Sequence, residues 1–214
     1  MRSVVALAAL FATAFATKGV DYSTAQTVAT HQCWKNNGVS FAIPRAYYSY
    51  GAFDPNGATN VAHAREAGIP YVDIYMFPCR GKSAASQVSD LVSKMGNANY
   101  GMIWLDIETN PSTGCSWTQG SGPSNCQYVT DLVNAVKSHG KTAGIYSSYY
   151  MWESIMGSAA ACTSQSGTSL WYAHYDGSPS FSDFRSFGGW TKPSIKQYVG
   201  DTTLCGAGVD LSFY

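Results

Sequence analysis

The chain has 214 residues, of which 45% are hydrophobic and 12% charged, so it can bury the core of one sizeable domain. Its 13 basic and 13 acidic residues give a formal net charge of zero, and the sequence contains no basic run. This composition argues against a surface for nucleic acid or for anionic lipid.

The first residues match a secretory signal peptide. Arg2 supplies a short positive segment, residues 4–15 are apolar but too few to span a bilayer, and Ala14-Phe15-Ala16 is a small-x-small pattern that signal peptidase accepts. We expect cleavage after Ala16, which leaves 17–214 as the mature protein, either secreted or in the lumen of a lysosome-like or phagosome-like compartment. A buried N-terminal helix is the alternative interpretation. No later segment is apolar enough to predict a membrane span.

Apolar alternation and helical spacing predict a regular succession of elements along the mature chain. The expected strands are 19–23, 39–48, 71–77, 102–105, 142–147, 169–175, 194–199 and 208–213, and the expected helices are 24–35, 60–67, 84–95, 127–139 and 149–156. A long loop is expected over 109–124. The segments 176–192 and 200–207 are rich in Gly, Ser or Pro and show no helical pattern.

Eight strands, five of them followed by helices, predict an α/β fold: a modified TIM-like barrel that is closed but lacks outer helices in its last third. The alternative is an open doubly wound sheet. That fold would be expected to carry a Gly-rich phosphate loop after the first strand, and none is present. No repeat, linker or second domain is evident, so we expect a single domain.

The stretch Tyr-Gly-Met-Ile-Trp-Leu-Asp-Ile-Glu (100–108) stands out because a short apolar run ends in two carboxylates. Residues i and i+2 of a strand point to the same side, so Asp106 and Glu108 would face one way with Cα atoms roughly 6.6 Å apart. Two acids so close raise the pKa of one of them, which general acid catalysis near neutral pH requires. The alternative is an acid pair that caps the strand and binds loop amides.

Two further acids lie on strands that a closed barrel brings together. Active sites of such barrels lie at the C-terminal ends of the strands. Asp21 follows the first strand and Asp210 lies within the eighth, and these strands are neighbours once the barrel closes. We therefore expect Asp21, Asp106, Glu108 and Asp210 at one mouth. The alternative is that Asp21 and Asp210 only cap loops.

Aromatic and amide side chains near the strand ends suit a carbohydrate ligand, although each aromatic taken singly is more often a core residue. The candidate binding residues are Tyr75, Tyr146, Trp171, Tyr175, Gln197 and Tyr198. His174 also falls at a strand end. We interpret it as a hydrogen-bonding wall residue rather than a base, because no nucleophile motif accompanies it.

Six cysteines in an exported chain predict three disulfides. Six cysteines allow 15 pairings, which the sequence alone cannot resolve. Cys115 and Cys126 flank a Ser/Gly/Pro-rich loop, and we expect them to pair. The spacings match no zinc module, and we expect neither a metal nor another cofactor.

Several motifs, in order along nearly the whole mature chain, resemble those of the glycoside hydrolase family 25 lysozymes. They are Gly-Val-Asp-Tyr-Ser (19–23), Leu-Asp-Ile-Glu (105–108), Ile-Tyr-Ser-Ser (145–148), Leu-Trp-Tyr-Ala-His-Tyr (170–175), Lys-Gln-Tyr (196–198) and Val-Asp-Leu-Ser (209–212). Asp-x-Glu also occurs in family 18 chitinases, but those carry further aspartates where this chain has Met102 and Trp104. Ser212 stands where many family 25 members have Asn, and the cysteines are not general to the family.

The resemblance implies a barrel of five β/α units followed by three strands, and N-acetylmuramidase activity on bacterial peptidoglycan. It implies that Asp21, Asp106, Glu108 and Asp210 are the functional carboxylates and that Glu108 is the general acid. Glycoside cleavage needs a protonated acid and a second negative group, so the chemistry agrees. Asp106 would then stabilise positive charge or orient the substrate's 2-acetamido group.

The expected substrate and partner is therefore the peptidoglycan glycan strand, which the protein cleaves as a monomer at the β-1,4 bond between N-acetylmuramic acid and N-acetylglucosamine. A catalytically silent peptidoglycan-binding or signalling module on the same barrel is the alternative. The presence of all four acids argues against it.

Overall fold

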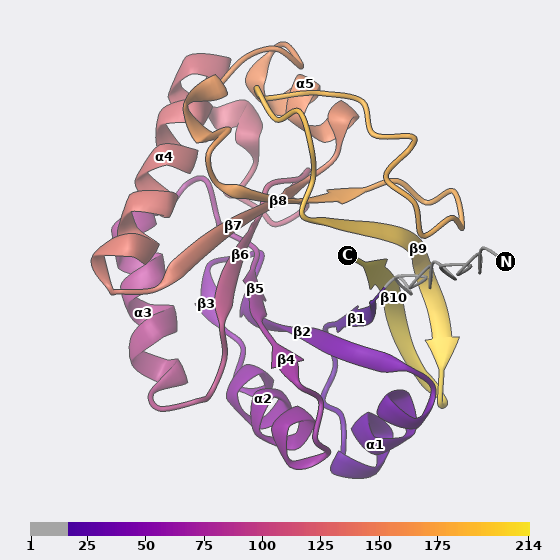
Figure 1. Ribbon diagram of the computed structural model, residues 1–214. Helices are drawn as coiled ribbons and strands as arrows, with labels where there is room; N and C mark the ends of the chain where they lie inside the picture. Colours follow the sequence, from indigo (N-terminus) through magenta and orange to yellow (C-terminus); the bar gives the residue numbers. More distant parts are fainter. Residues whose placement is uncertain (1–16) are drawn as a thin grey trace, which may run out of the picture.

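The computed structural model describes residues 17–214 as a barrel with helices around part of its outside (Figure 1). The predicted signal peptide, 1–16, lies outside the described residues. Within 17–214, no helix is both long and apolar enough to cross a bilayer.

The barrel wall is one closed sheet. Its strands are β1 (Lys18–Tyr22), β2 (Val39–Tyr48), β5 (Ile74–Met76), β6 (Met102–Asp106), β7 (Thr142–Ser147), β8 (Ser169–Ala173), β9 (Ile195–Leu204) and β10 (Ala207–Phe213). Two short strands, β3 (Ala52–Phe53) and β4 (Tyr71–Val72), also pair with β2. The sheet closes because β1 pairs with β10 on one side and with β2 on the other.

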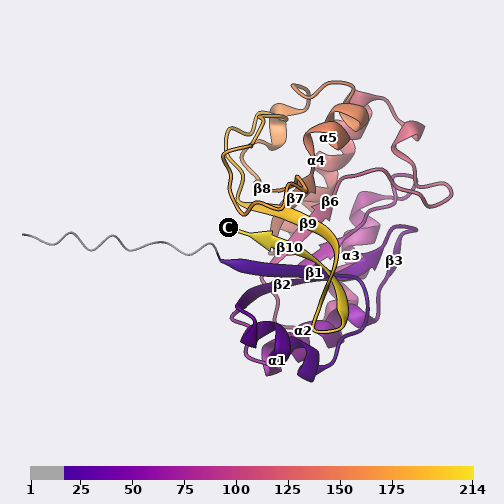
Figure 2. The same cartoon turned by 90° about the vertical axis from the view of Figure 1, so that its right-hand side faces the viewer.

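Five α-helices lie outside the wall, as predicted. They are α1 (Val28–Asn36), α2 (Asn56–Glu66), α3 (Ala84–Met95), α4 (Gly122–Ser138) and α5 (Tyr149–Met156), with short 3₁₀ turns at Trp117–Gln119 and Thr163–Gln165. No helix follows β8 within the described chain; the segment 174–194 covers that side as an irregular loop (Figures 1 and 2). The prediction of a modified TIM-like barrel is confirmed.

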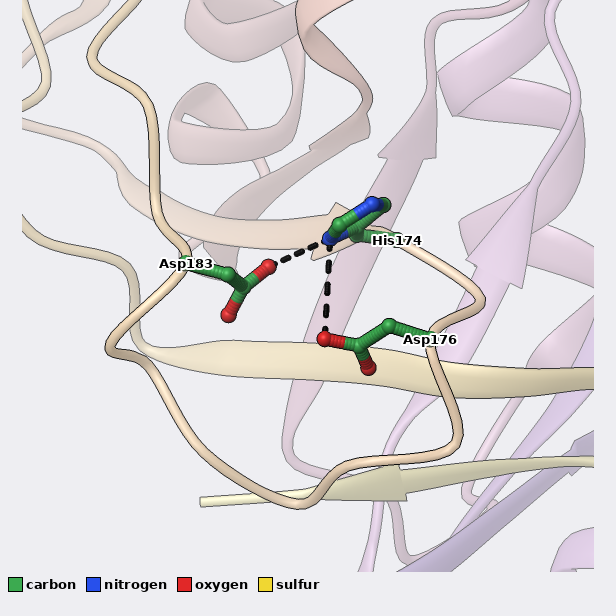
Figure 3. A group of neighbouring side chains, drawn as sticks. All are labelled: His174, Asp176 and Asp183. Carbon is green, nitrogen blue, oxygen red and sulfur yellow. Dashed lines mark hydrogen bonds and ion pairs between the residues drawn. The ribbon is translucent and has the colours of Figure 1, made fainter.

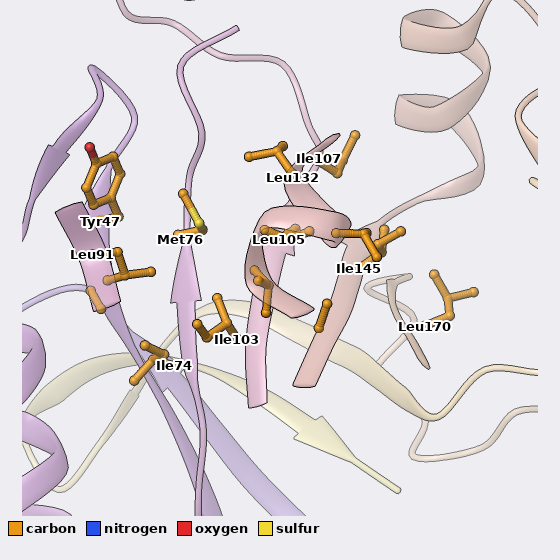
Figure 4. Close-up of a cluster of buried hydrophobic side chains, with 14 of the residues drawn as sticks. Tyr47, Ile74, Met76, Leu91, Ile103, Leu105, Ile107, Leu132, Ile145 and Leu170 are labelled. Carbon is orange, nitrogen blue, oxygen red and sulfur yellow. The ribbon is translucent and has the colours of Figure 1, made fainter. Parts of the chain in front are cut away.

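The strands are buried on both faces because the core has two parts. Inside the barrel, Trp104 and Trp171 pack edge-to-face with ring centroids 5.8 Å apart. Ile103 and Leu105 point the other way, toward the helices, where they join the larger cluster shown in Figure 4. This alternation on β6 directs Asp106, two residues after Trp104, toward the barrel axis.

The eighth wall strand, β10, runs antiparallel to both of its neighbours. Its C-terminal end therefore points away from the mouth, unlike that of the parallel strands. Asp210 still reaches the mouth because it lies in mid-strand, paired in register with Asp21 of β1.

The start of α4 differs from the prediction. The helix begins at Gly122 rather than at 127, and the expected long loop is correspondingly shorter. Ser121 is the N-cap residue, its backbone N–H donates to Ser124 Oγ at 2.8 Å, and Pro123 lies in the first turn. Residues that resemble a loop by composition are here a helix start, where Ser and Pro are favoured.

The predicted Cys115–Cys126 disulfide is wrong. The bonds are Cys33–Cys205, Cys79–Cys115 and Cys126–Cys162. The physical reason is the longer helix: Cys126 lies within α4 and bonds to a cysteine after α5, whereas Cys115 bonds to the segment that follows β5. The prediction of three disulfides is confirmed.

Candidate active site

A cavity of about 110 Å³ opens at the C-terminal ends of the parallel strands. Its lining contains nine of the ten residues that the sequence singles out: Asp21, Tyr75, Asp106, Glu108, Tyr146, Trp171, Tyr175, Gln197 and Asp210. The four acids thus come together from β1, β6, the segment after β6, and β10. Their convergence rests on long-range strand pairing rather than on neighbourhood in the sequence.

Tyr198 is the candidate residue that does not line this cavity. It follows Gln197 on β9, so its side chain takes the opposite face of the strand. There its ring lies edge-on to Phe213, with centroids 6.2 Å apart. The structure therefore gives Tyr198 a packing role outside the barrel and does not bring it to the predicted site.

The segment that carries Glu108 is held by hydrogen bonds although β6 itself ends at Asp106. Ile107 N donates to Tyr146 O at 2.8 Å, and Ser147 Oγ donates to Ile107 O at 2.8 Å. Trp117 Nε1 donates to the backbone oxygen of Glu108 at 2.7 Å. These contacts extend the strand geometry by two residues, so Glu108 faces the same cavity as Asp106.

Gln197 connects the acids to the tyrosines. Its Nε2 donates to Asp21 Oδ2 at 2.9 Å and to Asp210 Oδ2 at 3.0 Å. Its Oε1 accepts from the hydroxyls of Tyr146 at 2.6 Å and Tyr175 at 2.9 Å. A tyrosine hydroxyl can donate or accept, whereas a carboxylate can only accept, so the two aspartates fix which end of the amide faces them and leave Oε1 for the tyrosines.

Burial is the main reason why the acids of the cavity hold protons more strongly than usual. It raises the pKa of Asp106 well above its ordinary value, and the charges of Glu108 and Asp21 add to the effect. Burial also raises the pKa of Glu108, followed by the charge of Asp210. The sequence argument ascribed this shift to like charges alone, whereas desolvation contributes more.

Asp21 and Asp210 form a second close pair of acids. Burial and the charge of Asp210 raise the pKa of Asp21 well above its usual range. Burial also raises the pKa of Asp210, although a 2.6 Å hydrogen bond from Asp201 N to Asp210 Oδ1 favours the ionised form. Among described residues, the buried oxygens Asp21 Oδ1 and Asp106 Oδ1 have no hydrogen-bond partner.

This arrangement supplies what acid-assisted bond cleavage needs. The raised pKa values let a carboxyl keep its proton to higher pH than an exposed acid does, with a second acid close by. Burial raises the pKa of Tyr146 and Tyr75 well above the usual value, so both keep their hydroxyl protons and can donate hydrogen bonds. The aromatic rings provide flat apolar walls of the kind that sugar rings pack against.

Three residues outside the cavity, His174, Asp176 and Asp183, form the one group of metal-ligand type in the described chain (Figure 3). His174 Nδ1 lies 2.5 Å from Asp183 Oδ2 and 3.7 Å from Asp176 Oδ2. The fully buried Lys196 places its Nζ 2.8 Å from Asp176 Oδ2 and 2.8 Å from Asp183 Oδ1. Because Lys196 already supplies the cation, these carboxylates are poorly suited to a metal ion. His174 is thus hydrogen-bonded, as expected, but it does not line the cavity that contains the four acids.

Sequence reasoning missed the contribution of the β9–β10 hairpin. Asp201 lies in the half of β9 nearer the hairpin turn. Its φ is 50°, and its backbone N–H donates to Asp210 Oδ1. The hairpin also extends the mouth along an adjoining polar groove lined by Asp201, Thr202 and Thr203. The only signal in the sequence is a short polar Gly-Asp-Thr-Thr stretch, which also fits a simple loop.

Comparison with known proteins places these features in a family. A family model described as "Lysozyme-like protein 1" matches residues 12–198. The chain is 46% identical over 220 residues to "Probable GH family 25 lysozyme 2" of Dictyostelium discoideum, and the match covers 100% of both chains. It is 38% identical to "Counting factor 50" of the same organism over 77% of this chain and 54% of that protein. A family GH25 lysozyme from Aspergillus fumigatus has the same fold, with a TM-score of 0.74 at 20% identity, covering 94% of each chain.

Proposed function

Because the chain belongs to the glycoside hydrolase family 25 lysozymes, we propose that it cleaves the glycan strands of bacterial peptidoglycan. The bond it hydrolyses is the β-1,4 linkage from N-acetylmuramic acid to N-acetylglucosamine. The observation that carries the proposal is the convergence of four acids with raised pKa values in one aromatic-walled cavity at the barrel mouth.

In this reaction Glu108 acts as the general acid. It is less deeply buried than Asp106, so its carboxyl can reach a glycosidic oxygen in the cavity. Proton transfer to that oxygen releases the leaving sugar, and positive charge develops at the anomeric carbon of the other sugar. Asp106 lies beside it in the cavity and either stabilises this charge or orients the 2-acetamido group. Water then completes the hydrolysis, and the anomer of the product reports which route is used.

Asp21, Asp210 and Gln197 bind and position the substrate. The hydrogen bonds from Gln197 hold both aspartates in fixed orientations at the cavity wall. Each aspartate can accept hydrogen bonds from sugar hydroxyls or amides. The rings of Trp171 and Tyr175 provide apolar surfaces beside them.

A second candidate function is binding without cleavage, because one relative is named counting factor 50 rather than lysozyme. On this alternative the barrel binds peptidoglycan or acts as a signalling module without cleaving it. The buried, unpartnered carboxylate oxygens argue for hydrolysis, since a binding protein gains nothing from the cost of burying charge.

The place and form in which the protein acts are also part of the proposal. Three disulfides favour an oxidising environment, so we propose that the protein is secreted or enters the lumen of a lysosome-like or phagosome-like compartment. We also propose that the protein acts as a monomer.

The test is mass spectrometry of the products released from defined peptidoglycan by the purified protein. Cleavage with N-acetylmuramic acid at the new reducing end supports the proposal. Reducing-end N-acetylglucosamine would indicate a glucosaminidase instead. Sedimentation of the protein with intact cell walls, without any product, would support the silent binding module.

A further inference from the structure

A second cavity, of about 170 Å³, lies on the other side of the wall formed by the ends of β7 and β8. Its lining includes Tyr149, Tyr150, Tyr172, His174, Asp183 and Arg185. Tyr172 follows Trp171 on β8 and takes the outer face of the strand, whereas Trp171 faces the barrel interior. This cavity is therefore separate from the one that contains the four acids, but it opens at the same end of the barrel.

The two cavities are close along the chain. Tyr146 on β7 lines the first cavity, and Ser148, which follows β7 and caps the N-terminus of α5, lines the second. After β8, the neighbouring residues His174 and Tyr175 line the second and the first cavity, respectively. Two residues of extended chain span roughly 6.6 Å, so a substituent on a bound sugar needs only a few bonds to cross this rim.

Arg185 gives the second cavity a free positive charge. Its guanidinium carbon lies 3.6 Å from the centroid of the Tyr149 ring, and no described residue forms an ion pair or hydrogen bond with the guanidinium. Asp183, which also lines this cavity, and the nearby Asp176 are instead engaged by Lys196, whose Nζ lies 2.8 Å from a carboxylate oxygen of each. The first cavity, by contrast, contains only acids among its charged groups. An anionic group carried by the substrate would therefore be repelled from the first cavity and attracted by Arg185 in the second.

We propose that the second cavity binds the peptide stem of the substrate, with Arg185 contacting a stem carboxylate. The inference rests on the proposed function, because the stem is the peptide attached to the lactyl group of N-acetylmuramic acid. Such a stem combines carboxylates with small apolar side chains, which match one guanidinium and a wall of tyrosines. Three extended residues span about 10 Å, enough to pass from a bound sugar over the rim.

The experiment compares two substrates of equal glycan length, one with stem peptides and one from which an amidase has removed them. For each enzyme variant we compare kcat/KM on the two substrates. Arg185→Gln is expected to lower the ratio of intact to stem-free kcat/KM by about tenfold, the size of one charge-assisted hydrogen bond. Arg185→Lys should lower this ratio less than Arg185→Gln does, because lysine keeps the positive charge but cannot stack a planar group on Tyr149.

Lys141→Gln is the matched control. Lys141 also stacks on a tyrosine, with its Nζ 4.7 Å from the Tyr100 centroid, but it directly precedes β7 at the opposite end of the barrel. The Lys141→Gln variant loses the same unit of positive charge as Arg185→Gln, so it measures any general attraction between the protein and an anionic cell wall. Its ratio should equal that of the wild type.

The outcomes separate the inference from the proposed function. If wild-type protein cleaves neither substrate, the proposed function fails. If it cleaves both but Arg185→Gln leaves the ratio unchanged, the stem does not bind at Arg185 and the inference is overturned. If Arg185→Gln weakens cleavage of both substrates equally, the second cavity holds a sugar rather than a peptide, and the inference is again overturned.

Discussion

The depth at which each carboxyl lies separates the two acids of the Asp-Ile-Glu segment. Asp106 is 5% exposed, and one of its oxygens has no partner among described residues, whereas Glu108 is only partly buried. Because burial and then the charge of Glu108 raise the pKa of Asp106, the titrations of the two acids are linked. The more accessible member is the one that can deliver a proton to a substrate. This supports Glu108 as the donor on grounds independent of the resemblance.

Replacement of Glu108 by Gln is expected to reduce cell-wall clearing by about 10²–10⁴-fold, the typical contribution of general acid catalysis. Gln keeps the shape of the side chain, so circular dichroism and thermal unfolding should show an intact fold. Glu66→Gln, at the exposed end of α2, is the control and should clear walls at the wild-type rate. Near-wild-type clearing by folded Glu108→Gln would remove Glu108 from the mechanism.

The neighbours of Glu108 predict how its titration responds to substitution. Removing the negative charge of Asp210 should lower the pKa of Glu108, because that charge raises it. The alkaline limb of the pH–activity profile, where Glu108 loses its proton, should therefore move to lower pH in Asp210→Asn.

Asp21→Asn is the comparison, because the charge of Asp21 raises the pKa of Asp106 rather than contributing to that of Glu108. Its alkaline limb should move less. The profile is measured as kcat/KM on a soluble glycan. An equal shift in both variants would contradict this pairing of acids, and an unmoved limb in both would reduce Asp21 and Asp210 to binding or structural groups.

Helices and strands are well predicted where the hydrophobic periodicity of the sequence matches the burial of the element in the fold. Val39–Tyr48, Ala84–Met95, Thr142–Ser147 and Tyr149–Met156 begin and end where the pattern predicts. Alternation on β6 also predicts which side of the strand carries Asp106. The nine candidate residues that line the cavity could be predicted because they lie on or just after barrel strands, close to the mouth of the barrel.

Long-range partners are not predictable in this way. Nothing near Cys126 specifies Cys162, and nothing near Asp210 specifies that β10 runs antiparallel and presents this residue from mid-strand. The outer half of the β9–β10 hairpin pairs only with itself, so it lacks the apolar alternation of a barrel strand. Tyr198 shares a motif with Gln197, yet the two side chains face opposite ways because strand neighbours alternate.

Close packing inside the barrel predicts a sensitive position on β7. A Cβ atom on Gly144 would lie 2.3 Å from the Trp104 ring, which also packs on Trp171 and donates from Nε1 to Asp73. Gly144→Ala should therefore lower the free energy of unfolding by about 1–3 kcal/mol, the usual cost of overpacking. Gly167→Ala is the control, since its added methyl group meets no atom within 4 Å. Guanidinium unfolding of both variants gives the measurement, and equal stabilities would contradict the tight contact.

For the whole molecule, the acid cluster makes stability depend on pH in an uncommon direction. Burial raises the pKa of Asp21, Asp106, Glu108 and Asp210 in the folded state. Above the ordinary carboxyl pKa of about 4, the unfolded chain has lost these protons while the folded chain still binds them. Stability therefore falls as pH rises from about 4 toward the raised values. Asp183 has the opposite effect on stability and has it at lower pH. Hydrogen bonds, the first from Lys196, lower its pKa to about 2, so its contribution is lost as pH falls toward that value.

Asp106→Asn is accordingly expected to unfold at a higher temperature than the wild type at pH 7 while losing activity. The amide carries no charge to desolvate, and each kcal/mol gained raises Tm by about 2–4 °C for a chain of this size. At pH 4 the two proteins should differ much less, because the folded wild-type carboxyl keeps its proton and the unfolded one is still about half protonated. A gain of the same size at both pH values would show that packing, rather than ionisation, is responsible.

The pairing of β1 with β10 has a consequence for how the chain is made. Thr17 N and Tyr214 O are 3.1 Å apart, so the two ends of the described chain meet in one ladder of hydrogen bonds. A ribosome adds about 5–20 residues per second, and β1 must therefore wait roughly 10–40 s before β10 has been synthesised. During that interval the side of β1 that later pairs with β10 is an open strand edge. We expect the nascent protein to depend on chaperones until its last strand emerges and completes the ring.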